Sequence, residues 1–400
     1  MIRRSLYEGA ARPAAVAAII FVLGAILYPR SLTVFDLNAV VSSATPIVLL
    51  ALGMSFVLLA GEIDLSVGST MSLTSIMLAT WMGGRSGRVA PTILLALAVC
   101  AGVGLVNGLL TVVARIPSFI VTLSTLFVIA GLNLLWTNGS PPNNLAPTFP
   151  TLAIASKWLL STGLVVIVVA TLFATGVLNR TTFGGSLYLI GANRRAAHNT
   201  GVFIGRSVVV AFVVSSLCAG LAGVYATSYA GSGQTSLGAG MELTAIAAAV
   251  IGGVSLFGGK GTAAGACMGA LILALLFNLL LLAGASSDVQ PVVTGIVLLL
   301  GSLAYNRGAG SGGGANWVRS LQGAVMAALR SKGGAGAAGA GKRAADPSAH
   351  VQEAPSGRGR QVPVRSGHTS PRDVHHQSAV DQSAVAVRTP PSAGSVLQTK

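Results

Sequence analysis

Charged residues are scarce in this sequence of 400 residues. Asp, Glu, Lys and Arg together make up 9% of it, against about 25% in an average soluble domain, whereas hydrophobic residues make up 52%. Only ten residues are acidic, and six of these precede Tyr305. A soluble body of that size could not cover its surface with so few charges. We therefore predict that residues 1–305 form a membrane-embedded domain.

Cysteine and histidine are also rare. His198 is the only histidine before Tyr305, and the sequence suggests no Ser/His/Asp or Cys/His arrangement. We therefore expect no catalytic residue, no bound metal and no cofactor, and we predict that the chain is not an enzyme. The cysteines all fall within apolar runs, which favours small packing residues over a disulfide framework or a metal site; they are Cys100, Cys218 and Cys267.

Glycine is plentiful, but it does not form a phosphate-binding loop. Such a loop needs four residues between its first Gly and a Gly-Lys pair, followed directly by Ser or Thr. Gly253 has five residues before Gly259, and Gly261 follows Lys260. The stretch 336–343 has the right spacing but places Arg at the hydroxyl position. The chain is predicted to have no ATPase activity of its own.

Long apolar runs predict an all-α polytopic membrane protein. A spanning helix needs about 20 mostly apolar residues. The basic N-terminus resembles a signal peptide, but no cleavage site stands out after Tyr28, and the many runs that follow favour a first transmembrane helix. About ten spans are predicted, at residues 13–29, 38–60, 65–82, 91–113, 117–136, 158–178, 207–230, 242–257, 262–283 and 289–305.

Lys and Arg predict the orientation of these spans in the cell inner or plasma membrane. With the N-terminus in the cytoplasm, nine basic residues before Tyr305 fall inside and four outside, as the positive-inside rule favours. Ten spans would return the C-terminus to the cytoplasm. The formal net charge of +15 fits this rule better than nucleic-acid binding, so we expect membrane lipids and no nucleic acid as partners.

An internal repeat appears at an offset of 170 residues. Residues 60–83 and 230–253 are identical at ten of 24 positions without a gap. Five spans separate the two copies, and this odd number makes them face opposite ways. We therefore predict two inverted repeats, spans 2–5 and 7–10, a common build for transporters that alternate access. Chance similarity between apolar segments is the alternative. The matched pairs include Ser66 and Ser236, Gly68 and Gly238, and Met71 and Met241.

Residues 306–400 differ in composition from the rest. They are rich in Gly, Ala, Ser, Pro and Arg and contain few large apolar residues, so we predict a low-complexity, mostly disordered cytoplasmic tail. Within it, residues 317–332 space apolar side chains four apart beside basic residues. An amphipathic helix on an anionic membrane surface and a disordered linker with accidental spacing both fit this pattern.

Two carboxylates interrupt the apolar sequence at residues 61–69, GEIDLSVGS. Charges at membrane depth are costly and usually functional, which indicates contact with a substrate or a coupling ion. The structural alternative is that Asp64 or Ser66 caps the N-terminus of the next span, and the match with Ser236 favours capping in both repeats. The candidate residues for this motif and for translocation are Gly61, Glu62, Asp64, Ser66, Gly68 and Glu242.

The longest predicted cytoplasmic loop, residues 179–206, contains the stretch GANRRAAHNTG at 191–201. It reads as a short exposed helix bounded by glycines, with small residues on one side and cations on the other. Such a helix is suited to docking a cytoplasmic partner; a solvated basic loop that enforces topology is the alternative. The candidate residues are Gly191, Asn193, Arg194, Arg195, Ala196, Ala197, His198 and Gly201.

Four segments together resemble the permease subunit of ribose-type ABC sugar importers. The resemblance covers about residues 35–305, and the four motifs occur in the family's order. The chain departs from the family pattern at Glu62, where Gly is common, and at Arg194 and Arg195, where acids are common. The segments are GEIDLSVGS at 61–69, RIPSFIVTLSTLFVIAGL at 115–132, LIGANRRAAHNTGV at 189–202 and MELTAIAAAVIGGVSLFGGKGTAAGACMGALI at 241–272.

The resemblance implies ten helices per subunit and a second permease subunit, identical or not. It also implies a cytoplasmic ABC ATPase subunit and a periplasmic or extracellular sugar-binding protein. Residues 189–202 would be the coupling loop that inserts into the ATPase. The expected function is inward passage of a monosaccharide or small polyol.

Three other classes stay open. They are an ion-coupled secondary transporter using Asp64 or Glu242, an ABC permease for a nucleoside or branched amino acid, and a membrane scaffold that does not transport.

Overall fold

The computed structural model describes residues 2–27, 33–140, 143–154, 156–157 and 160–308, and within them it is almost entirely helical, as predicted. The predicted tail beyond residue 308, including its surface helix at 317–332, lies outside the described residues. The first half holds α1 (Ile2–Leu27), α2 (Val34–Leu59), α3 (Val67–Trp81), the 3₁₀ turn η2 (Ser86–Arg88), α4 (Val89–Val112), α5 (Ser118–Thr137) and α6 (Thr151–Ile154). The second half holds the short strands β1 (Ser156–Lys157) and β2 (Leu160–Ser161), then α7 (Thr162–Arg180), α8 (Thr182–Ala192), α9 (Arg194–Asn199), α10 (Ile204–Ala230), α11 (Met241–Ile251), α12 (Ala263–Leu282) and α13 (Val289–Gly308).

The predicted count of ten spans is not confirmed. Among the described residues, six helices are long and apolar enough to cross a membrane: α2, α4 with η2, α5, α7, α10 and α12. The runs predicted at 65–82 and 242–257 are instead α3, with 15 residues, and α11, with 11. Both are shorter than the roughly 20 residues that a span needs. We call α3 and α11 the half-helices.

The element boundaries repeat at the offset found in the sequence. Adding 170 to the bounds of α2 gives 204–229, and α10 spans 204–230. The same shift takes α3 to 237–251, which includes α11, and α4 to 259–282, which includes α12. It takes α5 to 288–307, one residue from the bounds of α13. The repeat therefore consists of a long helix, a half-helix and two further helices.

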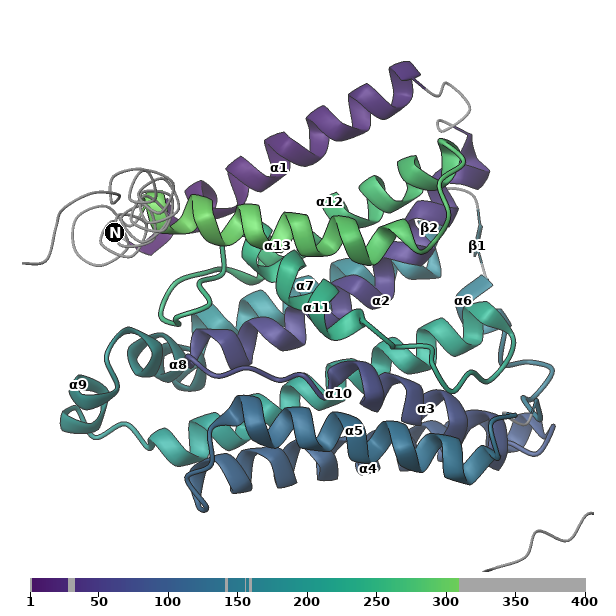
Figure 1. Ribbon diagram of the computed structural model, residues 1–400, viewed down its shortest axis with the longest axis horizontal. Helices are drawn as coiled ribbons and strands as arrows, with labels where there is room; N and C mark the ends of the chain where they lie inside the picture. The colour runs from purple at the N-terminus through teal and green to yellow at the C-terminus, as the bar shows by residue number, and fades with distance from the viewer. Residues whose placement is uncertain (1, 28–32, 141–142, 155, 158–159, 309–400) are drawn as a thin grey trace, which may run out of the picture. The chain divides into compact units, whose positions relative to one another are not determined.

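The two repeats run in opposite directions between two ends of the molecule. At one end, here the α9 end, the backbone N–H of Gly259 donates to the carbonyl of Leu59 at 3.0 Å. At the other, the α6 end, Ser228 Oγ donates to the carbonyl of Phe149 at 2.7 Å. The helix α2 therefore finishes at the α9 end, whereas its counterpart α10 begins beside α9 and finishes at the α6 end (Figure 1).

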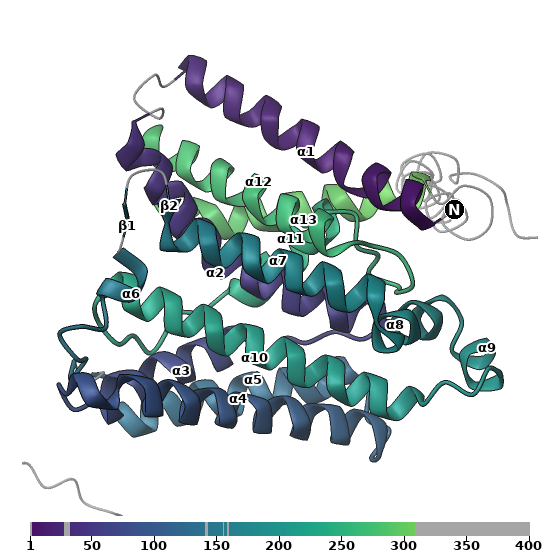
Figure 2. The ribbon, with the colours of Figure 1, turned by 180° about the vertical axis from the view of Figure 1, so that it is seen from behind.

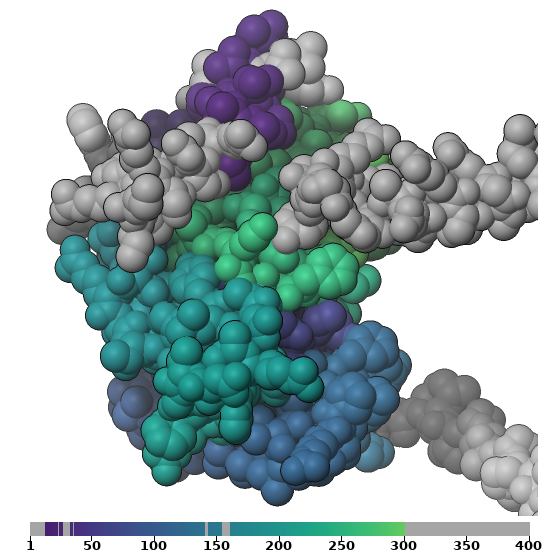
Figure 3. Space-filling model, turned by 90° about the vertical axis from the view of Figure 1, so that its left-hand side faces the viewer, coloured from purple at the N-terminus to yellow at the C-terminus, as the bar shows by residue number. Residues whose placement is uncertain are grey.

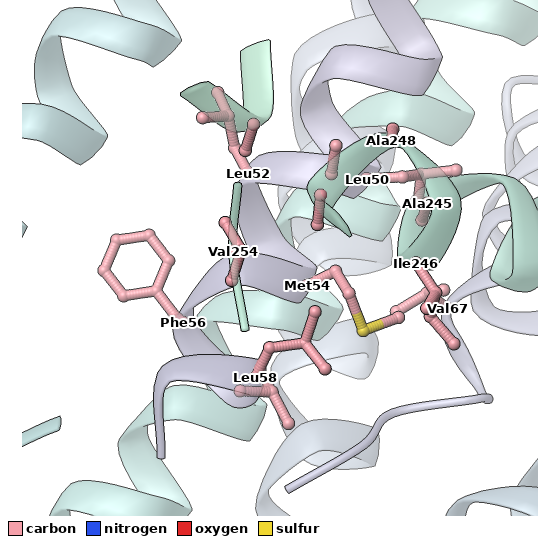
Figure 4. Packing of buried hydrophobic residues seen from close by; sticks show 14 of the residues in the cluster. Leu50, Leu52, Met54, Phe56, Leu58, Val67, Ala245, Ile246, Ala248 and Val254 are labelled. Atoms are coloured by element: carbon pink, nitrogen blue, oxygen red, sulfur yellow. The ribbon is translucent and has the colours of Figure 1, made fainter. Parts of the chain in front are cut away.

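The helix α2 occupies the centre of the molecule. In its most apolar stretch 83% of residues are buried, compared with 22% in α4 and in α7. It packs against α10, α11 and α12, and Figure 2 shows it between the α10 layer and the layer of α12 and α1. Leu50 and Met54 lie beside Ala245 and Ile246 of the half-helix α11 (Figure 4).

Small residues let the helices around α2 approach closely. A Cβ on Gly104 of α4 would lie 2.5 Å from the carbonyl oxygen of Phe212 and 2.7 Å from Cα of Val213, both on α10. Glycines at such positions are common where membrane helices pack backbone to backbone. By contrast, a Cβ on Gly102, two residues earlier in α4, would meet nothing within 4 Å.

Gly104→Ala is expected to lower the melting temperature of the purified protein in detergent. The added methyl group would have to push α4 away from α10, and overpacking of this kind typically costs about 1–3 kcal/mol. Thermal unfolding followed by size-exclusion chromatography measures the effect. The matched variant Gly102→Ala, on the same helix, should melt no lower than the unaltered chain. Equal melting temperatures for the two variants would contradict the close packing of α4 on α10.

Candidate functional site

The chain between α2 and α3, residues 60–66, forms an irregular stretch that we call the break segment. The helix α2 ends in a Schellman motif: the N–H of Gly61 donates to Leu58 at 2.8 Å and that of Glu62 donates to Val57 at 3.1 Å. Gly61 adopts a φ of +76°, which favours glycine. Both carboxylates of this segment are buried, with Glu62 8% exposed and Asp64 fully buried.

Asp64 and Ser66 connect the break segment to three helices through a network of hydrogen bonds. Its carboxylate accepts hydrogen bonds from Ser66 Oγ at 2.6 Å, from the Ser66 N–H at 3.0 Å and from Ser215 Oγ of α10 at 2.8 Å. Asn107 Nδ2 of α4 donates to Ser66 Oγ at 2.9 Å, and Thr125 Oγ1 of α5 donates to Asn107 Oδ1 at 2.6 Å. A buried carboxylate is tolerated where several donors face it, and this network supplies them.

Capping of α3 by Asp64 or Ser66 was predicted, with Ser236 as the counterpart in the second repeat, and for both serines this prediction is wrong. Ser66 does occupy the N-cap position of α3, but its hydroxyl makes no cap hydrogen bond and donates to Asp64 instead. The N-cap of α11 is Gly240, not Ser236. The backbone of Ser66 is helical, with φ −78° and ψ −7°, rather than extended as in a usual N-cap, and its oxygen accepts from Asn107 Nδ2 instead of a helix N–H.

The half-helices α3 and α11 meet at their N-termini. A Cβ on Gly68 of α3 would collide with the carbonyl oxygen of Gly238 and with Oε2 of Glu242, and a Cβ on Gly238 would collide with the carbonyl of Gly68. The carboxylate of Glu242 therefore lies where two helix N-termini converge, and it is only partly buried. Converging half-helix N-termini bind polar or anionic groups in transporters of inverted-repeat build.

The second predicted site, residues 191–201, is not one helix bounded by glycines. Gly191 lies inside the last turn of α8, and Asn193 then caps a separate helix, α9, by accepting from the Ala196 N–H at 3.0 Å. Gly201, with φ +78°, follows the end of α9. Ala197 is the buried side chain of α9, whereas the exposed ones include Arg194, Arg195, Ala196 and His198.

The end of α8 is clamped between loops from both repeats. A Cβ on Gly191 would collide with the carbonyl oxygen of Leu59, at the end of α2, and with the backbone N of Gly259, in the α11–α12 loop. Tyr188 Oη donates to the carbonyl of Gly261 at 2.9 Å, and burial raises the pKa of Tyr188, so the hydroxyl keeps its proton. Figure 3 shows the teal residues of α8 and α9 on this face, beside the green α11–α12 loop. We call residues 188–201 the elbow.

One ion pair joins the two predicted sites. Arg194 Nη1 lies 2.8 Å from Glu62 Oε1, and the side chains are 54% and 10% exposed respectively. The sequence assigned Glu62 to the break segment and Arg194 to the elbow, 132 residues apart, and gave no sign that they meet. Sequence reasoning also missed Ser215, Asn107 and Thr125, although a polar residue such as Asn107 inside an apolar run is a signal that could have identified them.

Metal-ligating side chains do not cluster in the described part of the chain. No group of three or more His, Cys, Asp or Glu lies close enough there to hold an ion. The three cysteines are free thiols, with Cys100 and Cys267 buried.

Comparison with known proteins identifies the family. Residues 37–301 match the family described as "Branched-chain amino acid transport system / permease component". The ribose import permease protein RbsC of Escherichia coli K12 is 34% identical over 285 residues, which cover 70% of this chain and 88% of that protein. RbsC of Bacillus subtilis 168 is 37% identical over 257 residues, 64% of this chain and 80% of that protein. The autoinducer 2 import system permease protein LsrC of Enterobacter sp. 638 is 36% identical over 286 residues, 71% and 82% respectively.

No solved structure matches the chain significantly. The family match covers well over half of the sequence, so the chain belongs to this family of membrane permeases. Its relatives are transport permeases rather than enzymes.

Asp64→Ala is expected to lower the melting temperature in detergent strongly. The substitution leaves the Ser215 hydroxyl and the Ser66 N–H without their buried acceptor, and each unsatisfied group costs about 1–3 kcal/mol. Ser124→Ala, which removes an exposed hydroxyl that donates to the Ile120 carbonyl within α5, is the control and should melt like the unaltered chain. If both variants melt alike, the Asp64 network does not hold the break segment.

Gly191→Ala is expected to displace the elbow. Its methyl group would collide with the α2 terminus and the α11–α12 loop, whereas a Cβ on Gly185, in the same helix, would meet nothing within 4 Å. Trypsin should therefore cleave after Arg194 and Arg195 faster in Gly191→Ala than in the unaltered chain. Gly185→Ala serves as the control and should be cleaved at the unaltered rate. Unchanged cleavage of both variants would refute the clamp.

Proposed function

We propose that this family member is the transmembrane permease subunit of an ABC importer that passes a monosaccharide or similar small polyol inward, driven by a separate ATPase subunit. Two of the relatives described above are ribose import permeases, at 34% and 37% identity. The four sequence motifs that resemble ribose-type permeases fall within the matched residues 37–301. A cell membrane location follows from the apolar helices.

The observation that carries the proposal is the geometry of the elbow. The helix α9 presents Arg194, Arg195 and Ala196 to solvent, while Gly191 just before it is clamped against both repeats. A short exposed helix whose preceding residue packs tightly against both repeats is suited to transmit the movement of a bound partner to the membrane domain. The ATPase would bind α9, and the clamp would pass its movement to the loops next to both half-helices.

The orientation and the other partners follow from this assignment. The α9 end would face the cytoplasm, with the N- and C-termini, as the distribution of Lys and Arg also favours. The α6 end would face outward, toward a periplasmic or extracellular sugar-binding protein. A second permease subunit, identical or not, would complete the pathway within the lipid bilayer.

The translocation candidates separate into two groups by their surroundings. Asp64 and Ser66 are fully buried and engaged in hydrogen bonds with each other, so they would hold the break segment rather than contact a solute. Gly68 and Glu242 lie at the converging N-termini of the half-helices, and Glu242 is only partly buried. Of the predicted residues, Glu242 is therefore the one placed to meet a polar solute.

A non-sugar solute is the second candidate, because the matched family is described by branched-chain amino acid transport. Import into proteoliposomes holding the permease, its ATPase and its binding protein tests both. ATP-dependent uptake of labelled ribose supports the sugar assignment, and uptake of leucine instead supports the second candidate. Uptake driven by a proton or sodium gradient without ATP would identify an ion-coupled transporter and overturn both.

Ala196→Trp is expected to weaken association with the ATPase on the order of tenfold. Ala196 is exposed on α9, so an indole there should leave the fold intact but obstruct a packed contact, at a typical cost of about 1–3 kcal/mol. Co-purification of the ATPase in detergent measures the effect. Ala114→Trp, exposed between α4 and α5, is the control and should retain the ATPase. Equal retention by both variants would remove α9 from the docking surface.

A further inference from the structure

The helix α9 has few attachments to the membrane part. Among its six residues, Ala197 is the buried one, and the helix packs only against α8 and α10 to any extent. The link from α9 to the break segment is the 2.8 Å contact between Arg194 and Glu62. Among the described residues it is the only salt bridge. It is also the only hydrogen bond there that joins α9 to the break segment.

Glu62 is placed to pass movement onward. It follows the Schellman turn at the end of α2 and stands two residues before Asp64, which is bound to Ser215 of α10. Four residues after Glu62, Ser66 leads directly into the half-helix α3. The N-terminus of α3 touches Gly238 of the second repeat. A displacement of Glu62 therefore acts on the start of α3 and, through it, on the meeting point of the half-helices.

The burial of Glu62 gives the contact more weight than a surface ion pair. Exposed pairs contribute little because water screens both charges. The Glu62 side chain is only 10% exposed, so loss of Arg194 would leave a nearly buried carboxylate without its cation, and the break segment would have to shift to hydrate it. Arg194 is half exposed and can still move with a partner bound to α9.

We propose that Glu62 and Arg194 form a latch that makes the break segment follow the movement of α9, so that they are positioning residues for energy coupling. The proposal rests on the proposed function, because it needs an ATPase bound to α9. The clamp at Gly191 holds the end of α8, whereas the latch ties the first residue of α9 to the break segment that leads into α3. Without the latch, ATP hydrolysis would continue with less solute moved.

The test measures labelled ribose imported per ATP hydrolysed by the full complex in proteoliposomes. Glu62→Gln and Arg194→Gln should each lower this ratio on the order of fivefold, the lower range of coupling between sites, while the ATPase co-purifies as before. The double variant Glu62→Gln/Arg194→Gln should lose no more than either single variant. The exchanged variant Glu62→Arg/Arg194→Glu should regain most of the ratio. Arg180→Gln, an exposed cation at the same end, is the control and should match the unaltered chain.

Each outcome decides between the latch and its alternatives. Single variants with an unaltered ratio, or losses that add up in the double variant, would overturn the latch while leaving the proposed function intact. Loss of ATPase co-purification in Arg194→Gln but not in Glu62→Gln would make Arg194 a docking residue and also overturn it. A complex of the unaltered chain that imports no ribose and hydrolyses no ATP would overturn the proposed function, and the latch with it.

Discussion

The irregular break segment between α2 and the half-helix α3 is the constraint on which the rest of this structure depends. Backbone N–H and C=O groups in a bilayer have no water to bind, so a break in a helix is tolerated only where protein groups satisfy it. In the break segment Asp64 accepts from the Ser66 N–H, Ser118 Oγ accepts from the Ile63 N–H, and Ser215 Oγ of α10 donates to the Asp64 carboxylate. Because Asn107 and Thr125 extend the network, α4, α5 and α10 must all be positioned around one short stretch of chain.

Because the repeats are inverted, the α9 end of the molecule lies next to the chain that precedes the half-helix α3 and next to the chain that follows the half-helix α11. At the α9 end, the elbow touches the loop that precedes α3 and the loop that follows α11. Movement of the elbow would therefore reach α3 through its N-terminus and α11 through its C-terminus. Since these half-helices meet at Gly68 and Gly238, both displacements converge on the same place in the membrane. Contact between glycines keeps that meeting point tight.

Much of the fold could be predicted from the sequence, and the failures have physical causes. The apolar runs located the long helices, and the offset of 170 residues located the repeat. The count of ten spans is not confirmed, because a run such as 242–257 is apolar enough for a span but its helix α11 ends at Ile251. Ser66 does not cap α3 because its oxygen accepts from Asn107 Nδ2, on a helix 41 residues away in the sequence. A local sequence pattern does not reveal such a distant partner.

The sequence by itself determined that the chain lies in a membrane, repeats at an offset of 170 residues and places two carboxylates between two apolar runs. Only the tertiary structure decided which side chains those carboxylates meet. Glu62 pairs with Arg194, 132 residues away, and Asp64 binds Ser215, 151 residues away. The physical reason is that hydrophobic periodicity shows only which face of a helix is buried. A hydrogen bond forms only when donor and acceptor lie within about 3 Å, and the packing of the helices sets that distance.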